Sequence, residues 1–226
     1  VLVRKALAMA IDTTTLVEKV TKGGQIATSA MVPAMEGYTP AKGNPYNVEE
    51  AKKLLAEAGY PNGKGFPKLT ILYNTNDGHK KIAEFVQEQW KNNLGIEVSL
   101  KNEEWKTFLD TRANSHDFVV ARAGWVGDYL DPNTFLDMFI VGSGNNDGLY
   151  ANPEYDALVK KAGTMKAGPE RMATLQAAEA LLIAKDQAVI PFYHYVEQDL
   201  IDTTKWDGWY ANPLGVHDWK YIGPKK

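Results

Sequence analysis

Short apolar segments alternate with amphipathic segments between residues 68 and 123, and this alternation constrains the fold more than any other feature of the chain. Three apolar segments predict strands: 68–73 (KLTILY), 96–100 (IEVSL) and 117–123 (DFVVARA). Between them, residues 79–93 and 103–112 carry apolar side chains at the spacing of helices. Strands and helices that alternate with short links predict parallel pairing with right-handed crossovers. The sequence therefore indicates an α/β fold with an open, mostly parallel sheet flanked by helices.

Capping residues and breakers predict the elements around this unit. Asp12 is a suitable N-cap for a helix that Gly23 ends, and Asn47 is a suitable N-cap for a helix that Gly59 ends. The prolines and glycines of 25–47 predict an irregular loop. Later elements are expected as a short helix at 132–139, a flexible glycine-rich segment at 142–148, helices at 153–165 and 169–185, and a proline-interrupted strand at 188–196.

Composition excludes several classes of protein. The 226 residues are 44% hydrophobic and 23% charged, which is typical of a soluble globular protein with a substantial core. A net charge of -3 argues against nucleic-acid binding, which needs a basic surface, and against attraction to anionic membranes. The absence of cysteine removes disulfides, thiolate metal sites and cysteine nucleophiles. No stretch reaches the roughly 18 apolar residues of a membrane-spanning helix.

Motifs of catalysis and metal binding are missing from the sequence. The chain has no GxSxG elbow, no P-loop and no GxGxxG. Its histidines are scattered without HxxxH or HExxH spacing, and they are His79, His116, His194 and His217. We therefore predict no metal site, no cofactor and no enzyme activity. A glycosidase pair of Asp128 and Asp131 is a weak alternative, because two aspartates on one loop are common.

The candidate site follows two of the predicted strands. Residues 74–79 come directly after the first strand, and residues 122–129 come directly after the third. Because the carboxyl ends of parallel strands lie on one rim of a sheet, both segments are expected at the rim where ligands of α/β proteins bind. The site is therefore predicted from topology and not from a motif.

The second segment combines opposite charges with aromatic rings: Arg122, Trp125, Asp128 and Tyr129. A zwitterionic ligand suits it, because Asp128 can pair with an ammonium group and Arg122 can offer a forked contact to a carboxylate. Gly124 and Gly127 leave the backbone open to an extended peptide that adds as a strand. An ordinary surface pair of Arg122 and Asp128, with Trp125 in the core, is an equally open interpretation of the spacing.

Seven segments distributed along the whole chain have counterparts, in the same order, in one known family. They are VRKALAMAID, EEAKKLLAEAGY, LYNTNDGHKK, EEWKTFLDTR, ARAGWVGDYLDP, NPEYDALV and AVIPFYHYV. Together they resemble the C-terminal half of the oligopeptide-binding proteins of bacterial ABC importers, which are extracytoplasmic solute-binding proteins of family 5. NPEYDALV is general to the family, whereas LYNTNDGHKK together with ARAGW-x-x-DY is specific to its peptide-binding branch.

The resemblance implies a lobe of the type II periplasmic-binding-protein fold. Residues 1–226 would form the C-terminal, peptide-binding lobe of a longer two-lobed protein, without the N-terminal lobe. The first ten residues agree with this expectation, because they predict an amphipathic helix already in progress. The tail at 200–226 has three tryptophans among turns and is expected to pack against the missing part.

The resemblance also implies roles for individual residues. Asp128 would hold the α-amino group of a peptide, and Trp125 would line a strand-like groove together with the backbone of Gly124 and Val126. Three basic side chains would offer positive charge to the peptide carboxylate, different ones for different peptide lengths: Arg122, Arg112 and His79.

The implied function is the non-catalytic capture of short oligopeptides for ABC-type import. The whole protein would be a periplasmic monomer that delivers peptides to an ABC permease without inserting into the membrane. Relatives carry other ligands, so a murein peptide, a nickel chelate or haem is an alternative. A hydrolase with Asp128 as base is a less favoured one.

Overall fold

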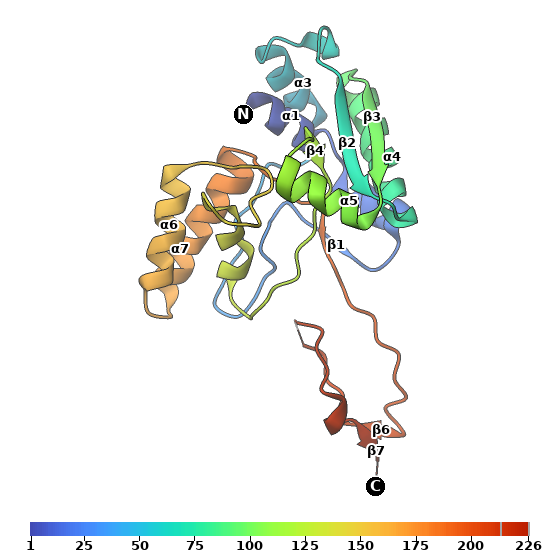
Figure 1. Ribbon diagram of the computed structural model, residues 1–226, viewed down its shortest axis with the longest axis vertical. Coiled ribbons are helices and arrows are strands. Elements are labelled where there is room, and N and C mark those ends of the chain that lie inside the picture. Colours follow the sequence, from blue (N-terminus) through green and yellow to red (C-terminus); the bar gives the residue numbers. More distant parts are fainter. Residues whose placement is uncertain (213, 226) are drawn as a thin grey trace.

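The computed structural model, which describes residues 1–212 and 214–225, is built around a parallel sheet with the strand order β3-β2-β4. Strand β2 (Leu69–Asn74) pairs along its whole length with β3 (Val98–Glu103). On its other side β2 pairs at two positions with β4 (Val120–Ala121). Helices flank this open sheet (Figure 1), so the predicted α/β fold is confirmed.

Helix α4 (Asp77–Leu94) crosses from β2 to β3, and α5 (Trp105–Asp110) lies between β3 and β4. Helix α4 begins two residues before the predicted start, because the side chain of Asn76 caps it by accepting from the backbone N–H of His79 at 3.1 Å. The crossover predicted from the sequence is therefore present, with its first turn closer to the end of β2.

The strand predicted at 117–123 is wrong in length, since only Val120–Ala121 pairs with β2. Before it, His116 adopts a left-handed conformation, and Phe118 donates to the carbonyl of His116 in a tight turn. After it, one more backbone bond forms, from Arg122 to the carbonyl of Leu72 at 2.8 Å, and the chain then leaves the sheet. The length of β4 is therefore limited by the turn at His116 before it and by the exit of the chain from the sheet after Arg122.

The loop at the amino end of the sheet is fixed by two glycines. Gly63 and Gly95 both have positive φ, and a Cβ on Gly63 would lie 2.5 Å from the carbonyl oxygen of Gly95. A Cβ on Gly95 would in turn lie 2.6 Å from the carbonyl oxygen of Asn62. The turn that follows α3 and the turn that ends α4 therefore touch backbone to backbone, which only glycine permits at both positions.

Two hydrophobic cores stabilise the fold. The first, which we call the sheet core, lies between the sheet, α1 (Leu2–Met9), α3 (Val48–Glu57) and α4. Trp90 of α4 is its largest buried side chain, with 1% of its surface exposed, and its Nε1 donates to the carbonyl of Leu7 at 2.8 Å. Asn47 caps α3 as predicted, with its side chain accepting from Glu50.

The second core, which we call the hairpin core, is formed by α6 (Pro153–Thr164) and α7 (Pro169–Ala180) against the irregular segment 30–41. Both helices were predicted. Glu179 of α7 is completely buried in this core. Its carboxylate accepts from Val32 N at 2.8 Å, Tyr38 Oη at 2.6 Å and Ala41 N at 2.7 Å, so it holds the predicted loop in place.

Arg4 joins the two cores. Its guanidinium lies on α1 and donates through Nε and Nη2 to the carbonyl of Asp186, at 3.0 and 2.8 Å. Asp186 follows the π-helical turn that extends α7, so the first helix is tied to the end of the hairpin core. Figure 1 shows the hairpin beside the sheet, with the irregular segments between them.

The remaining elements are short. They are α2 (Thr13–Thr15), β1 (Ile26–Ala27), β5 (Tyr193–His194), β6 (Trp206–Asp207) and β7 (Gly223–Pro224), with 3-10 turns at Pro61–Gly63, Pro132–Phe135, Asp137–Phe139 and Trp219–Tyr221 and π-helical turns at Leu16–Thr21, Thr111–Ser115 and Leu181–Lys185. The strand predicted at 188–196 is reduced to β5, which follows Pro191 and pairs with β1. The helix predicted at 132–139 is two 3-10 turns.

Beyond residue 196 the chain leaves the body as a long extension (Figure 1). Among its described residues this extension contains the antiparallel pair of β6 and β7 and the 3-10 turn Trp219–Tyr221. Residues 213 and 226 of the tail predicted at 200–226 lie outside the described residues. Large apolar side chains are exposed along it, with Leu200 fully exposed and Trp219 80% exposed. Among the described residues, no helix combines the length and the apolar character needed to cross a membrane.

Candidate functional site

The predicted rim of the sheet brings His79 and Arg122 together. Strands β2 and β4 are parallel neighbours, so their carboxyl ends lie side by side, and His79 is in the first turn of the helix that follows β2. Burial lowers the pKa of His79, and the positive charge of Arg122 lowers that pKa further. His79 is therefore a neutral imidazole near neutral pH, close enough to Arg122 for the two groups to interact electrostatically.

Arg122 is half-buried and keeps its charge available. Its Nη2 donates to the hydroxyl of Tyr195 at 2.8 Å, which brings the segment after β5 to the rim. No carboxylate among the described residues forms an ion pair with it. The imidazole of His79 also has a free polar atom, because its Nδ1 is buried without a hydrogen-bond partner. Both groups can therefore serve an incoming carboxylate.

Arg112 lies at the same rim, but its guanidinium already forms an ion pair with a carboxylate of the protein, that of Asp147. Its Nε donates to Asp147 Oδ2 at 2.8 Å, its Nη2 contacts the same oxygen, and its Nη1 donates to the carbonyl of Arg122 at 3.4 Å. Only 15% of the Arg112 side chain is exposed. His116 Nδ1 lies 3.1 Å from the carbonyl of Asp147. The glycine-rich segment predicted to be flexible is thus anchored here, through a residue that the sequence did not single out.

The segment after Arg122 leaves its backbone outside the sheet. Gly124 is exposed, and so is Val126, of whose surface 73% is accessible. Trp125 is half-buried, and its Nε1 is buried without a hydrogen-bond partner. The segment thus places a flat aromatic side chain between stretches of open backbone, and its role as a groove wall stays a prediction. The competing interpretation of Trp125 as an ordinary core side chain is not favoured, because the indole is only partly buried.

Asp128 is exposed and its carboxylate forms no ion pair with any described residue. Its backbone N–H donates to the buried hydroxyl of Thr134 at 3.0 Å. Asp137 lies nearby: burial raises the pKa of its carboxyl, and although the hydroxyl of Tyr129 opposes this, the negative charge of Asp128 raises the pKa further. The loop therefore presents a free carboxylate in a region of negative potential, which favours a cation.

Asp131 is not available as a partner for Asp128 in hydrolysis. The guanidinium of Arg171 grips it with two contacts, from Nη1 to Oδ2 at 2.6 Å and from Nη2 to Oδ1 at 2.9 Å. A glycosidase needs two carboxylates that face one scissile bond, and this geometry provides only one. Arg122 and Asp128 are not paired with each other either, so each leaves its charge free for a ligand.

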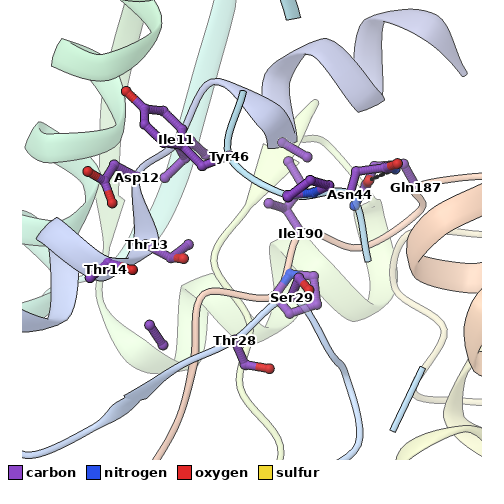
Figure 2. A pocket seen from close by; sticks show the side chains of 14 residues that line it. Ile11, Asp12, Thr13, Thr14, Thr28, Ser29, Asn44, Tyr46, Gln187 and Ile190 are labelled. Atoms are coloured by element: carbon purple, nitrogen blue, oxygen red, sulfur yellow. Dashed lines mark hydrogen bonds between the residues drawn. The ribbon is translucent and has the colours of Figure 1, made fainter. Parts of the chain in front are cut away.

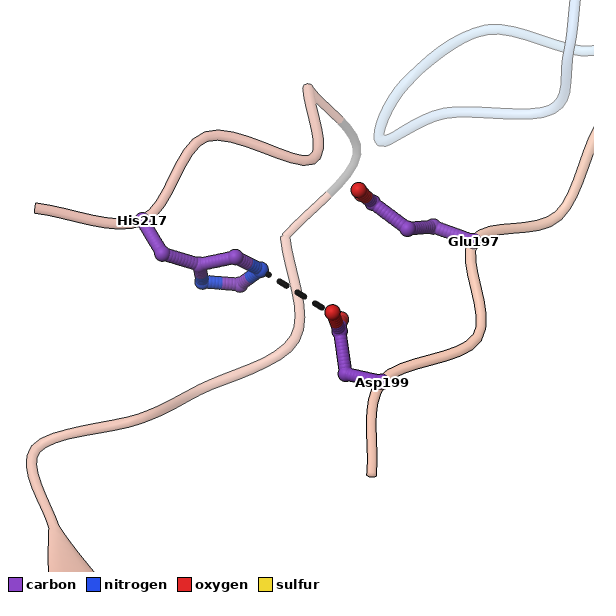
Figure 3. Close-up of side chains that lie close together, drawn as sticks. All are labelled: Glu197, Asp199 and His217. Carbon is purple, nitrogen blue, oxygen red and sulfur yellow. Dashed lines mark ion pairs between the residues drawn. The ribbon is translucent and has the colours of Figure 1, made fainter. Parts of the chain in front are cut away.

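Two further features were not expected from the sequence. A cavity of 270 Å³ lies where α2 and β1 meet the segments around Asn44 and Gln187 (Figure 2). In the extension, the side chains of Glu197, Asp199 and His217 converge (Figure 3), with His217 Nε2 3.5 Å from Asp199 Oδ2 and the potential ligand atoms within 4.8 Å of one another. They are residues that could hold a metal ion, although exposed carboxylates beside an imidazole are common without one.

Comparison with known proteins agrees on one family. The sequence profile described as "Bacterial extracellular solute-binding proteins, family 5 Middle" matches residues 1–147. The periplasmic oligopeptide-binding protein OppA of Salmonella typhimurium is 41% identical over 221 residues, which is 92% of this chain and 39% of that protein. The chain thus spans about two fifths of the length of this curated relative.

Solved structures give the same result. The crystal structure of a periplasmic oligopeptide-binding protein from Borrelia burgdorferi (OppAIV) matches with a TM-score of 0.87 and 41% identity, covering 100% of this chain and 45% of that one. The OppA of Haemophilus influenzae, solved in complex with the peptide RPPGFSPFR, matches with a TM-score of 0.78 and 36% identity, covering 86% of this chain and 39% of that one.

Proposed function

The chain belongs to the bacterial extracellular solute-binding proteins of family 5, and from this premise we propose that it captures short oligopeptides without transforming them. It has the α/β fold of a type II periplasmic-binding lobe, as the resemblance implied. Two of the relatives described above carry oligopeptide binding in their names, and a third, from Haemophilus influenzae, is solved with a bound peptide. These similarities support an oligopeptide as the ligand class.

The observation that carries the proposal is the pair of unpaired charges on one segment. Arg122 has no carboxylate partner and Asp128 has no cationic partner among the described residues. A zwitterion satisfies both at once, with its ammonium on Asp128 and its carboxylate on Arg122. Such charge-assisted hydrogen bonds are about twice as strong as neutral ones, so they orient the ligand.

The open backbone supplies the part of recognition that ignores side chains. Residues 123–127 follow β4 without pairing in the sheet, with Gly124 and Val126 exposed. An extended peptide that pairs with such a segment gains main-chain hydrogen bonds whatever its sequence. Trp125 then forms an aromatic wall of the groove. This combination suits a carrier that accepts many different peptides.

The three basic side chains have graded roles in the proposal. Arg122 and His79 are ready to face the ligand carboxylate, because neither is bound to a protein carboxylate. Arg112 reaches a ligand only by giving up Asp147, so we propose that it serves peptides of a length that the other two do not reach. Different peptide lengths would therefore select different partners at the same rim.

In the whole protein, this lobe and a second lobe would close over the peptide, and the tail at 200–226 would pack on that second lobe. The exposed apolar side chains of the extension, such as Leu200 and Trp219, support this placement. We propose a monomeric, extracytoplasmic carrier that hands peptides to an ABC permease, with no nucleic-acid partner and no membrane insertion. Hydrogen exchange of residues 200–226 tests the tail, which is protected in the two-lobed protein if the proposal is right.

The test of the function uses the full-length protein and a tripeptide with a free or an N-acetylated amino end. Asp128→Ala removes the carboxylate proposed for the ammonium, so we expect it to weaken the free peptide by about 10- to 100-fold, the range of a lost charged hydrogen bond. The acetylated peptide should lose little. Calorimetry measures both affinities.

Equal losses for the two peptides would show that Asp128 does not bind the amino group. Mass spectrometry of the recovered peptide decides the second point of the proposal. Cleavage or modification of the tripeptide on incubation with the protein would contradict a non-catalytic carrier.

A further inference from the structure

The carboxylate that we propose for the amino end of the ligand is carried by a loop with little regular structure. Asp128 lies between the end of β4 and the 3-10 turn Pro132–Phe135. Its side chain makes no hydrogen bond within the described residues. A free carboxylate on a loose loop loses conformational entropy when it binds a cation, so the loop must be held from elsewhere if binding is to be strong.

The structure holds this loop through Asp131. One carboxylate oxygen of Asp131 accepts from the N–H of Asn133 at 2.9 Å and so caps the 3-10 turn. That turn buries Thr134, which has 1% of its surface exposed, and the hydroxyl of Thr134 accepts from the N–H of Asp128 at 3.0 Å. Asp131 therefore fixes Thr134, and Thr134 fixes the backbone of Asp128.

Asp131 is in turn held by Arg171, which lies in the first turns of α7. The two parallel contacts of the fork are 2.6 and 2.9 Å long, and the Nε of Arg171 donates to the carbonyl of Ala162 at the end of α6 at 3.0 Å. The Arg171 side chain is 13% exposed and that of Asp131 is 24% exposed. All three contacts place the guanidinium at a single position between both helices of the hairpin.

We propose that Arg171 is a positioning residue for the amino-end subsite, acting on Asp128 through Asp131 and Thr134. This inference rests on the function proposed above and adds a residue that lies 43 positions away from Asp128 in the sequence. The hairpin core then has a role in recognition, although Arg171 touches no ligand. Binding sites whose supporting residues are loosened lose affinity even when every contacting group is still present.

The two parallel contacts from Arg171 to Asp131 allow the effect of position to be tested separately from the effect of charge. Arg171→Lys keeps the positive charge beside Asp131 but cannot form two parallel contacts and also reach Ala162. In the full-length protein, we expect this variant to lower the affinity for a free tripeptide about tenfold relative to the N-acetylated tripeptide, a change of about 1.4 kcal/mol. Asp131→Asn should give a loss in the same direction, because its amide cannot accept from both arms of the fork.

A matched control comes from the same hairpin. Lys185 forms an exposed ion pair with Glu154 at 3.1 Å, far from the loop that carries Asp128 in sequence and without contacts to it. Lys185→Ala should leave the ratio of the two affinities unchanged. Thermal unfolding of each variant gives stability separately, and a purely structural role of Arg171 would lower the melting temperature while the ratio stays constant.

The outcomes are distinct. A reduced ratio in Arg171→Lys, with both affinities unchanged in Lys185→Ala, supports the positioning role. An unchanged ratio in Arg171→Lys, in a protein whose wild type prefers the free peptide, overturns this inference and leaves the proposed function standing. A wild type that binds the free and acetylated peptides equally overturns the proposed function and this inference together.

Discussion

The sheet core and the hairpin core are built in different ways, and each carries one end of the proposed site. The sheet core packs apolar side chains of α1, α3 and α4 against the sheet, and Trp90 is its largest fully buried side chain. The hairpin core joins α6 and α7 to a segment more than 100 residues earlier, around the buried carboxylate of Glu179. His79 and Arg122 stand on the first core, whereas Asp131 ties the loop of Asp128 to the second.

The distance between the charges of Arg122 and Asp128 is therefore set by the packing of both cores and not by one segment alone. Although Arg122 and Asp128 lie close in sequence, their surroundings are held by different packing units. Arg4 links those units through the carbonyl of Asp186. A mutation inside one core should therefore disturb one end of the ligand site more than the other.

The largest effect is expected from breaking the sheet core. Trp90→Ala removes the largest fully buried side chain and its hydrogen bond to Leu7, so we expect a loss of about 3–5 kcal/mol in the free energy of unfolding. Denaturant unfolding followed by circular dichroism measures it. Trp105→Ala is the control, because Trp105 is 51% exposed, and a loss as large as that of Trp90→Ala would contradict the packing described here.

A smaller effect is expected from disturbing the hairpin core. Glu179→Gln places an amide where two oxygens accept from three donors, so at least one buried donor loses its partner. We expect a loss of about 1–3 kcal/mol in the free energy of unfolding. In hydrogen exchange, the amides of Val32 and Ala41 should lose protection.

The amides that keep their hydrogen-exchange protection in Glu179→Gln show whether the two cores are independent. If the cores are separate packing units, the amides of α4 should exchange in Glu179→Gln as they do in the wild type. Glu170→Gln is the matched control, because Glu170 is exposed on the same helix and its carboxylate makes no hydrogen bond or ion pair with the described residues. Equal loss of protection in α4 and in 30–41 would mean that the two cores behave as one.

The smallest effect concerns pH and the cationic end of the site. Burial, and then the charge of Arg122, lower the pKa of His79 in the unliganded protein, so the folded chain resists protonation of this side chain. The resulting stabilisation is complete above the ordinary histidine pKa, and it is lost as the pH falls through the lowered pKa of the folded state. A ligand carboxylate beside His79 favours the protonated form and raises that pKa. Binding should therefore take up a proton, and affinity should rise up to about tenfold as pH falls from about 7.5 to 5.5.

Calorimetry in buffers of different ionisation enthalpy detects this uptake. His79→Asn should remove the pH dependence and the proton uptake while leaving binding of a peptide amide, which has no terminal carboxylate, nearly unchanged. An affinity that is flat across this range in the wild type would place His79 outside the carboxylate end.

Local sequence patterns predicted the parts of the fold that local patterns determine. The strand at Leu69–Asn74, the crossover helix and the α6–α7 hairpin follow from apolar periodicity and capping residues. The short length of β4 could not be predicted, because pairing depends on the partner strand and on the turn at His116. Within the site, the charges of Arg122 and Asp128 were evident from their spacing.

The partners of those charges were not evident. Arg112 forms an ion pair with Asp147, which lies 35 residues later in the sequence. Asp131 forms an ion pair with Arg171, which lies 40 residues later. No periodicity marks an ion pair at such separations, since it arises from how the helices pack. Sequence patterns thus named the groups that can meet a ligand, and the structure was needed to tell which of them the protein itself already uses.

The contact between Gly63 and Gly95 has a consequence for how such a lobe can change over time. Because a methyl group at either position would overlap a main-chain oxygen, and both residues have positive φ, any replacement there strains the backbone and forces it to shift. The opposite rim carries the candidate site on loops in which Gly124, Val126 and Asp128 are exposed. Substitutions that change ligand preference can therefore accumulate at the carboxyl ends of the strands, while the two glycines at the amino ends stay the same.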